Sequence, residues 1–141
     1  MDLMLIVRDA LASSLVGTLL AARDARESGR EVAVLLTGEA LAAVARGSFA
    51  WPRELAGQTM RLGLADRGKA LGLPLLTKGE GRQLDPKALL AETGAAGVAL
   101  YACPIWSALL ALETPPSGLT AIDRPELTRL LTQTGRVVGS L

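Results

Sequence analysis

The sequence predicts an α/β protein with a parallel, doubly wound sheet. Short apolar runs typical of strands alternate with helical segments at intervals of about thirty residues, which favours right-handed crossover connections. Two of these runs, residues 3–7 and 32–36, are apolar throughout, as expected for parallel strands that are covered on both faces. The 141 residues suit one compact domain over residues 1–141, because no linker divides them.

The first half of the chain predicts two strand–helix pairs followed by a less regular segment. Residues 3–7 form the first predicted strand, and residues 10–28 repeat Leu and Ala at helical spacing. A second buried strand covers residues 31–36 and ends at Thr37, whose hydroxyl can cap a helix over residues 39–45. The other elements predicted for this half are a helix over residues 53–71 and a short strand over 73–76, which Pro74 disfavours.

The second half continues the alternation of helices and strands. Asp85 followed by Pro86 is the pairing expected at the cap and first position of a helix, which we expect to stop at Gly94. Asp123 is a second candidate cap, ahead of a helix that contains Leu127. The remaining predicted elements are a strand over residues 97–102, a helix over 104–112, a short strand over 119–122 and a closing strand over 136–140.

Charge and residue content exclude several classes of function. Fifteen Lys and Arg against fourteen Asp and Glu leave a formal net charge of +1, which gives no global field for nucleic acid or an acidic membrane surface. The absence of His excludes Ser-His-Asp and Cys-His nucleophile pairs and, with only one Cys, nearly every zinc site. We therefore expect no cofactor, no metal and no nucleic-acid partner. The single Cys103 cannot form an intramolecular disulfide, which is consistent with a cytoplasmic protein.

One apolar stretch is long enough to cross a membrane. Residues 93–112 include no charged side chain, and 20 residues can span a bilayer. Gly94, Gly97 and Pro104 interrupt this stretch, which predicts a strand followed by a helix rather than a span. We therefore expect no membrane partner.

The loops that follow the strands are where a site is expected, because ligands of open parallel sheets collect at the carboxyl ends of the strands. Cys103 follows one predicted strand and precedes Pro104, which is favoured at the first position of a helix. The free amides of Ile105 and Trp106 and the helix dipole would favour the thiolate form of Cys103. Such a sulfur can attack a substrate or carry a second sulfur as a persulfide.

A pocket around this sulfur is the second expectation. Tyr101 shares a strand face with Cys103, and Trp106 follows three residues later, so both can wall a pocket. The expected pocket comprises Arg8, Thr37, Gly38, Tyr101, Pro104, Ile105 and Trp106. The alternative interpretation is structural, because free Cys is among the most buried residue types and aromatic side chains dominate cores.

A further motif matches the spacing of a phosphate-binding P-loop over residues 63–69. Ala70 stands where Ser or Thr would hold magnesium, and no buried strand precedes the motif, so we interpret the match as accidental. The neighbouring cations predict a solvated helix face rather than a nucleic-acid groove, since no aromatic residue is interleaved with them. These cations are Arg53, Arg61, Arg67 and Lys69.

Segments in three parts of the chain resemble the DsrE/DsrF-like proteins of sulfur metabolism. Residues 31–39, EVAVLLTGE, resemble the second strand of that family and its Thr-Gly turn, and residues 97–103, GVALYAC, resemble the strand that leads into its cysteine. Residues 121–127 and 135–138 resemble the closing helix and strand. In order and spacing, the resemblance covers nearly the whole chain.

The resemblance implies a flavodoxin-like three-layer sandwich with a mostly parallel sheet of five or six strands. It also implies assembly into homotrimers or hexamers. In the sulfur-relay members of the family, a cysteine after a strand accepts sulfane sulfur as a persulfide and passes it to a partner protein. That cysteine corresponds to Cys103, so the resemblance implies sulfur donor and acceptor proteins as partners.

Two functions from different classes remain open at this point. In the first, the protein is a sulfur carrier or sulfurtransferase that uses Cys103 as a persulfide-forming thiolate. In the second, it is a non-catalytic oligomeric small-ligand-binding or structural protein whose crevice at the strand ends holds a small ligand or nothing. Exposure of the thiol distinguishes them, because a donor and an acceptor must reach the sulfur.

Overall fold

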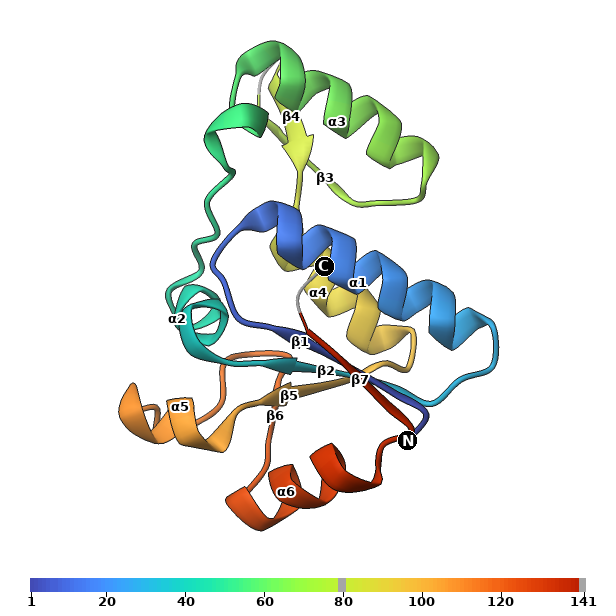
Figure 1. Ribbon diagram of the computed structural model, residues 1–141. Helices are drawn as coiled ribbons and strands as arrows, with labels where there is room; N and C mark the ends of the chain where they lie inside the picture. The colour runs from blue at the N-terminus through green and yellow to red at the C-terminus, as the bar shows by residue number, and fades with distance from the viewer. Residues whose placement is uncertain (79–80, 140–141) are drawn as a thin grey trace.

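A computed structural model describes residues 1–78 and 81–139 of the chain. Its centre is a five-stranded parallel sheet in the order β6-β5-β2-β1-β7, with helices on both faces (Figure 1). The strands are β1 (Leu3–Val7), β2 (Val32–Leu36), β5 (Ala99–Ala102), β6 (Thr120–Ala121) and β7 (Arg136–Val138). The predicted flavodoxin-like α/β class is confirmed, with all five strands of the sheet parallel.

Helices cover both sides of the sheet, and one further helix, α3 (Gln58–Ala70), packs on a separate hairpin (Figure 1). They are α1 (Ala12–Glu27), α2 (Gly38–Arg46), α3 (Gln58–Ala70), α4 (Pro86–Ala95), α5 (Pro104–Leu109) and α6 (Arg124–Gln133), with a 3₁₀ turn, η1 (Arg53–Leu55), before α3. In Figure 1, α1 and α4 cover one face and α6 covers the other. Right-handed crossovers explain this placement. The chain passes from β1 to β2, β5 and β6 in one direction across the sheet and then returns to β7 at the opposite edge. The helix of this last crossover, α6, therefore lies on the other face.

The two faces of the sheet bury alternate residues of each strand. Leu5, Val34 and Leu100 belong to the larger core under α1 and α4. Met4 and Leu35, their neighbours in sequence, belong to the smaller core under α6. Because both faces are covered, the strands are apolar at successive positions, which is the pattern that the sequence predicted.

A separate antiparallel hairpin accompanies α3 at one end of the molecule (Figure 1). It consists of β3 (Leu75–Lys78) and β4 (Gly81–Leu84), and β4 packs along α3. Gly68 permits this contact, since a side chain there would collide with Leu84. The sequence predicted a strand over residues 73–76, but the observed strand begins after Pro74 and lies outside the main sheet. Strand β4 was not predicted.

Two of the three helix caps predicted from the sequence are present in the structure. Asp85 accepts a hydrogen bond from the Ala88 amide at 3.1 Å, and Asp123 accepts one from the Glu126 amide at 2.8 Å, as predicted. The cap predicted for Thr37 is wrong, because its side chain forms no capping hydrogen bond with α2.

Several element boundaries differ from the prediction for backbone reasons. Helix α4 continues through Gly94 to Ala95, and the positive φ of +93° at Gly97 turns the chain toward β5. Helix α5 ends at Leu109 rather than at residue 112, because Ala111 adopts a left-handed φ of +54°. Strand β7 ends at Val138, and residue 140, the end of the predicted strand, lies outside the described residues.

The apolar stretch at residues 93–112 divides among α4, β5 and α5. Among the helices formed by residues 1–78 and 81–139, none has the length and apolar character needed to cross a membrane.

Candidate functional site

The candidate site lies at the carboxyl edge of the sheet, where neighbouring strands deliver Arg8, Thr37 and Cys103. Backbone pairing continues one residue beyond the strands. The Thr37 amide donates to the Val7 carbonyl at 3.1 Å, and the Cys103 amide donates to the Leu36 carbonyl at 3.0 Å. The start of each loop is therefore fixed by the sheet.

A crevice of about 480 Å³ opens at this edge between the loops after β1 and β2 and the helix α5. Its lining consists of Arg8, Asp9, Thr37, Gly38, Glu39 and Trp106. A second hollow of about 380 Å³ shares Gly38, Glu39 and Trp106 with the first and extends along α2 toward Arg46. The two hollows thus adjoin at the first turn of α2 and the Trp106 indole.

Gly38 allows the close approach of α5 to α2. Its φ is +54°, in the left-handed region that L side chains rarely adopt. A Cβ atom built there would lie 3.4 Å from the Arg8 carbonyl oxygen and 4.0 Å from Cε2 of Trp106. The glycine therefore shapes the crevice wall as well as the turn.

Backbone amides at the start of α2 supply the main hydrogen-bond donors of the crevice. The Ala40 amide donates to the Arg8 carbonyl at 3.1 Å. The amides of Gly38 and Glu39 have no hydrogen-bond partner among residues 1–78 and 81–139. These amides lie at the positive end of the α2 dipole, so the first turn of α2 favours an anionic or acceptor group.

Two carboxylates, those of Asp9 and Glu39, line the crevice. The Asp9 carboxylate accepts hydrogen bonds from the Leu11 amide at 3.0 Å and from the Ser14 hydroxyl at 2.9 Å, so it is committed to the start of α1. Glu39 is exposed and projects from the first turn of α2. A small ligand can therefore place an acceptor at the α2 amides and an apolar or planar part against Trp106.

Cys103 does not line either hollow. It is 4% exposed and packs in the smaller core with Met4, Leu35 and Leu127. Its sulfur accepts no capping hydrogen bond from α5. Of the two interpretations that the sequence left open for Cys103, an accessible thiol and a buried one, the structure shows the buried one. The cause is strand alternation, which directs Tyr101 and Cys103 to the face that α6 covers.

The other predicted pocket residues separate into two groups. Arg8, Thr37, Gly38 and Trp106 lie together around the crevice, although the expected pocket was one around the sulfur of Cys103. Tyr101 instead packs against the smaller core. Pro104 and Ile105 begin α5 but do not line the crevice, and the Ile105 side chain is 46% exposed.

Sequence reasoning missed the contribution of α2 beyond its first turn. Ala42, Ala43 and Arg46 line the second hollow with Glu39. These residues recur at three- and four-residue spacing and share one helix face, which is the signal that could have identified them.

Two further predictions concern phosphate and metal sites. Residues 63–69 lie entirely inside α3 and form no loop that could hold a phosphate. The interpretation of the P-loop match as accidental is therefore confirmed. The described residues hold no cluster of three or more metal-ligating His, Cys, Asp or Glu side chains.

Comparison with known proteins identifies the fold. No protein-family model and no curated protein matches the sequence. Among solved structures, the ychN protein from E. coli superimposes with a TM-score of 0.59 at 18% identity, over 99% of each chain. The conserved protein of unknown function BT1422 from Bacteroides thetaiotaomicron gives a TM-score of 0.52 at 12% identity, over 98% of this chain and 94% of that one. The chain therefore has a YchN-like α/β fold, and at these identities the similarity is one of fold alone.

Proposed function

We propose that the protein is a non-catalytic oligomeric subunit that binds a small ligand in the crevice at the carboxyl edge of the sheet. The observation that carries this proposal is the separation of the thiol from the crevice. Cys103 is 4% exposed under α6, whereas the crevice presents Thr37, the Gly38 amide and the Trp106 indole. The accessible chemistry at this edge is thus hydrogen bonding and stacking.

The crevice favours a ligand that carries both an oxyanion and a planar ring. The amides of Gly38 and Glu39, which have no partner among the described residues, suit the oxyanion. Trp106, which is 40% exposed, offers one face to the ring. The volume of about 480 Å³ lies within the range of about 300–1,000 Å³ that is usual for small-molecule sites.

An amide-resolved NMR titration tests this proposal, with inorganic phosphate and adenosine monophosphate as probes. We expect saturable shifts of the Gly38 and Glu39 amides, and tighter binding of the probe that carries a ring. Trp106→Ala should weaken the binding of adenosine monophosphate by about tenfold and leave the binding of phosphate unchanged, because one stacking contact typically contributes this much. Leu131→Ala is the control, because Leu131 is 41% exposed on α6 and is not among the residues that line either hollow. Absence of any shift at these two amides would contradict the proposal.

Assembly into a homotrimer or hexamer is part of the same proposal. Two apolar side chains of α5 that do not line the crevice, Ile105 and Leu109, are 46–67% exposed in the single chain. An apolar surface of this kind is typical of a subunit contact. Light scattering should give a multiple of the 14.7 kDa chain mass, and Leu109→Asp should lower it. A wild-type protein that stays monomeric at high concentration would exclude this assembly.

The sulfur carrier is the second candidate, and the shallow packing of α5 favours it. None of the six residues of α5 is buried, and Cys103 is the N-cap residue of this helix, so opening of α5 would move the backbone that carries Cys103 away from the α6 side chains that cover the thiol. A Cys103 thiolate would attack the outer sulfur of a donor persulfide, R–S–SH. The S–S bond of the donor breaks, the donor leaves as R–S⁻, and Cys103 becomes Cys–S–SH. An acceptor thiolate would then take the outer sulfur and release the Cys103 thiolate. A mass increase of about 32 Da on the native chain after polysulfide treatment would support this function.

A further inference from the structure

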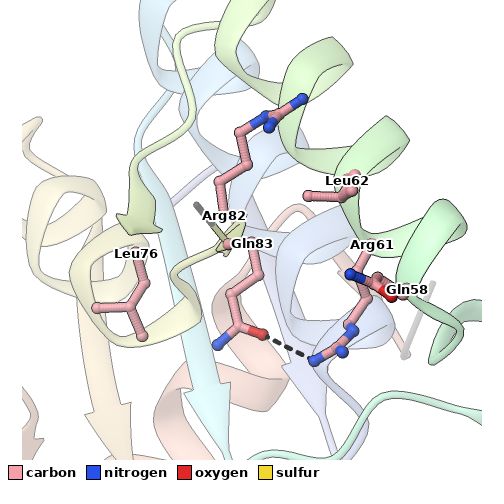
Figure 2. Close-up of a pocket in the computed structure, with 7 residues that line it drawn as sticks. Gln58, Arg61, Leu62, Leu76, Arg82 and Gln83 are labelled. Atoms are coloured by element: carbon pink, nitrogen blue, oxygen red, sulfur yellow. Dashed lines mark hydrogen bonds between the residues drawn. The ribbon is translucent and has the colours of Figure 1, made fainter. Parts of the chain in front are cut away.

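A second pocket lies between α3 and the hairpin, away from the crevice. It encloses about 260 Å³. Helix α3 contributes Gln58, Arg61 and Leu62, and the hairpin contributes Leu76, Arg82 and Gln83. Figure 2 shows that Gln58, Arg61 and Gln83 gather at one end of the pocket and that Leu76 lies across from them.

The two arginines of this pocket differ in their partners. Arg82 forms a two-bond ion pair with Asp66, with 2.8 Å between Nη2 and Oδ2, and its guanidinium points away from Arg61 (Figure 2). Arg61 donates from Nη1 to the Gln83 side-chain oxygen at 3.4 Å. Within residues 1–78 and 81–139, Arg61 has no ion pair, and its buried Nε has no hydrogen-bond partner. No described residue therefore pairs with this partly buried positive charge of the pocket.

The segment of sequence that contains Arg61 is basic. Residues 53–84 hold six Lys and Arg against three Asp and Glu, a net charge of +3, although the whole chain carries only +1. Among the described residues that line the pocket, none carries a carboxylate. The first turn of α3, which includes Gln58, has no side-chain cap, so its dipole adds to the same sign.

We propose that this pocket binds a small organic oxyanion that pairs with the Arg61 guanidinium. The Arg61 guanidinium is partly buried and has no counterion among the described residues, and a carboxylate or phosphate group can supply one through paired hydrogen bonds. Leu62 and Leu76 take the short apolar part of the ligand, and the Gln58 and Gln83 amides complete the polar end. The volume lies below the usual range of about 300–1,000 Å³, which selects a ligand of only a few carbon atoms.

An NMR titration at constant ionic strength tests the proposal with three probes. Butyrate represents a carboxylate, inorganic phosphate represents the headgroup of a phosphate ester, and chloride controls for ionic strength. We expect saturable shifts of the Arg61 Nε and Gln83 side-chain signals with one or both oxyanions and none with chloride. Tighter binding of butyrate assigns the pocket to carboxylates, and tighter binding of phosphate assigns it to phosphate esters.

Matched variants separate this pocket from general attraction to a basic helix. Arg61→Gln should weaken binding by at least about tenfold, the loss expected for one charge-assisted pair. Arg67→Gln removes the same charge from the same helix outside the pocket, and it should change binding by less than about twofold. Equal weakening by the two variants would overturn the proposal, as would the absence of saturable shifts with both oxyanions.

A third variant tests the same pocket in case Arg61→Gln does not fold. Leu76 is 51% exposed on the hairpin, so Leu76→Trp can fill the pocket without changing its charge. We expect this variant to keep the wild-type circular dichroism spectrum and to lose binding. Wild-type affinity in Leu76→Trp would also overturn the proposal.

Discussion

Reagents that modify thiols provide a direct measure of the burial of Cys103. The chain has a single cysteine, so every modification detected by mass spectrometry reports on this residue. We expect the native protein to resist both an alkylating reagent and a polysulfide at neutral pH. We also expect the same protein to react readily in denaturing urea.

The size of the protection follows from the packing of the thiol. Cys103 is 4% exposed and is covered by Leu127 and Leu130 of α6 and by Met4 of β1, so a reagent reaches it only after the structure opens. Global unfolding costs about 5–15 kcal/mol, and each 1.4 kcal/mol or so lowers the open population tenfold. If the smaller core opens only with the whole domain, the native rate should be at least about 10³-fold below the unfolded rate.

The assay is a time course of alkylation at increasing urea concentration, with Cys103→Ala as the unreactive blank. Global opening exposes a large surface, so its rate of modification rises steeply with urea, whereas opening of α5 alone gives a weak dependence. A native rate within about tenfold of the unfolded rate would refute the burial argument. A protected but measurable rate with little urea dependence, together with addition of one sulfur, would favour the sulfur carrier over the ligand-binding subunit.

Three further predictions test the local structure around the site and the hairpin. Gly38→Ala forces a side chain into the left-handed region and should cost about 1–2 kcal/mol, a decrease of about 3–7 °C in the melting temperature measured by calorimetry. The hydrogen bond from Arg82 lowers the pKa of Asp66, so Arg82→Gln should raise that pKa toward its ordinary value in an NMR titration, and the stabilisation by this pair should disappear as the pH falls through the lowered pKa. Asp123→Ala should lower the unfolding free energy in urea by about 1 kcal/mol because it removes a cap, whereas Thr37→Ala, which removes none, should leave it nearly unchanged.

Most of the main sheet could be predicted because its strands are buried on both faces. The apolar runs that became β1 and β2 were located to within a residue, and the caps Asp85 and Asp123 marked the starts of two helices. The hairpin was harder to predict. Strand β4, with sequence GRQL, has one buried residue and no apolar alternation, so its structure depends on packing against α3.

Part of the candidate site could also be predicted, because the order of the strands determines which loops lie together. Arg8, Thr37 and Gly38 follow strands that lie side by side, so their proximity followed from the topology. The direction of the Cys103 side chain did not follow from its position in the sequence. A residue directly after a strand can face either helix layer or the rim, and only the register of β5 with β2 determines which.

The sequence by itself determined the alternation of strands and helices, the absence of histidine chemistry and the presence of one thiol, because composition and periodicity are local properties. The tertiary structure alone decided that α6 covers Cys103 while α5 places Trp106 beside Gly38. It also decided that the hairpin leaves Arg61 without a counterion among the described residues. These outcomes depend on which helix packs on which face of the sheet, and that is set by contacts between residues far apart in the chain.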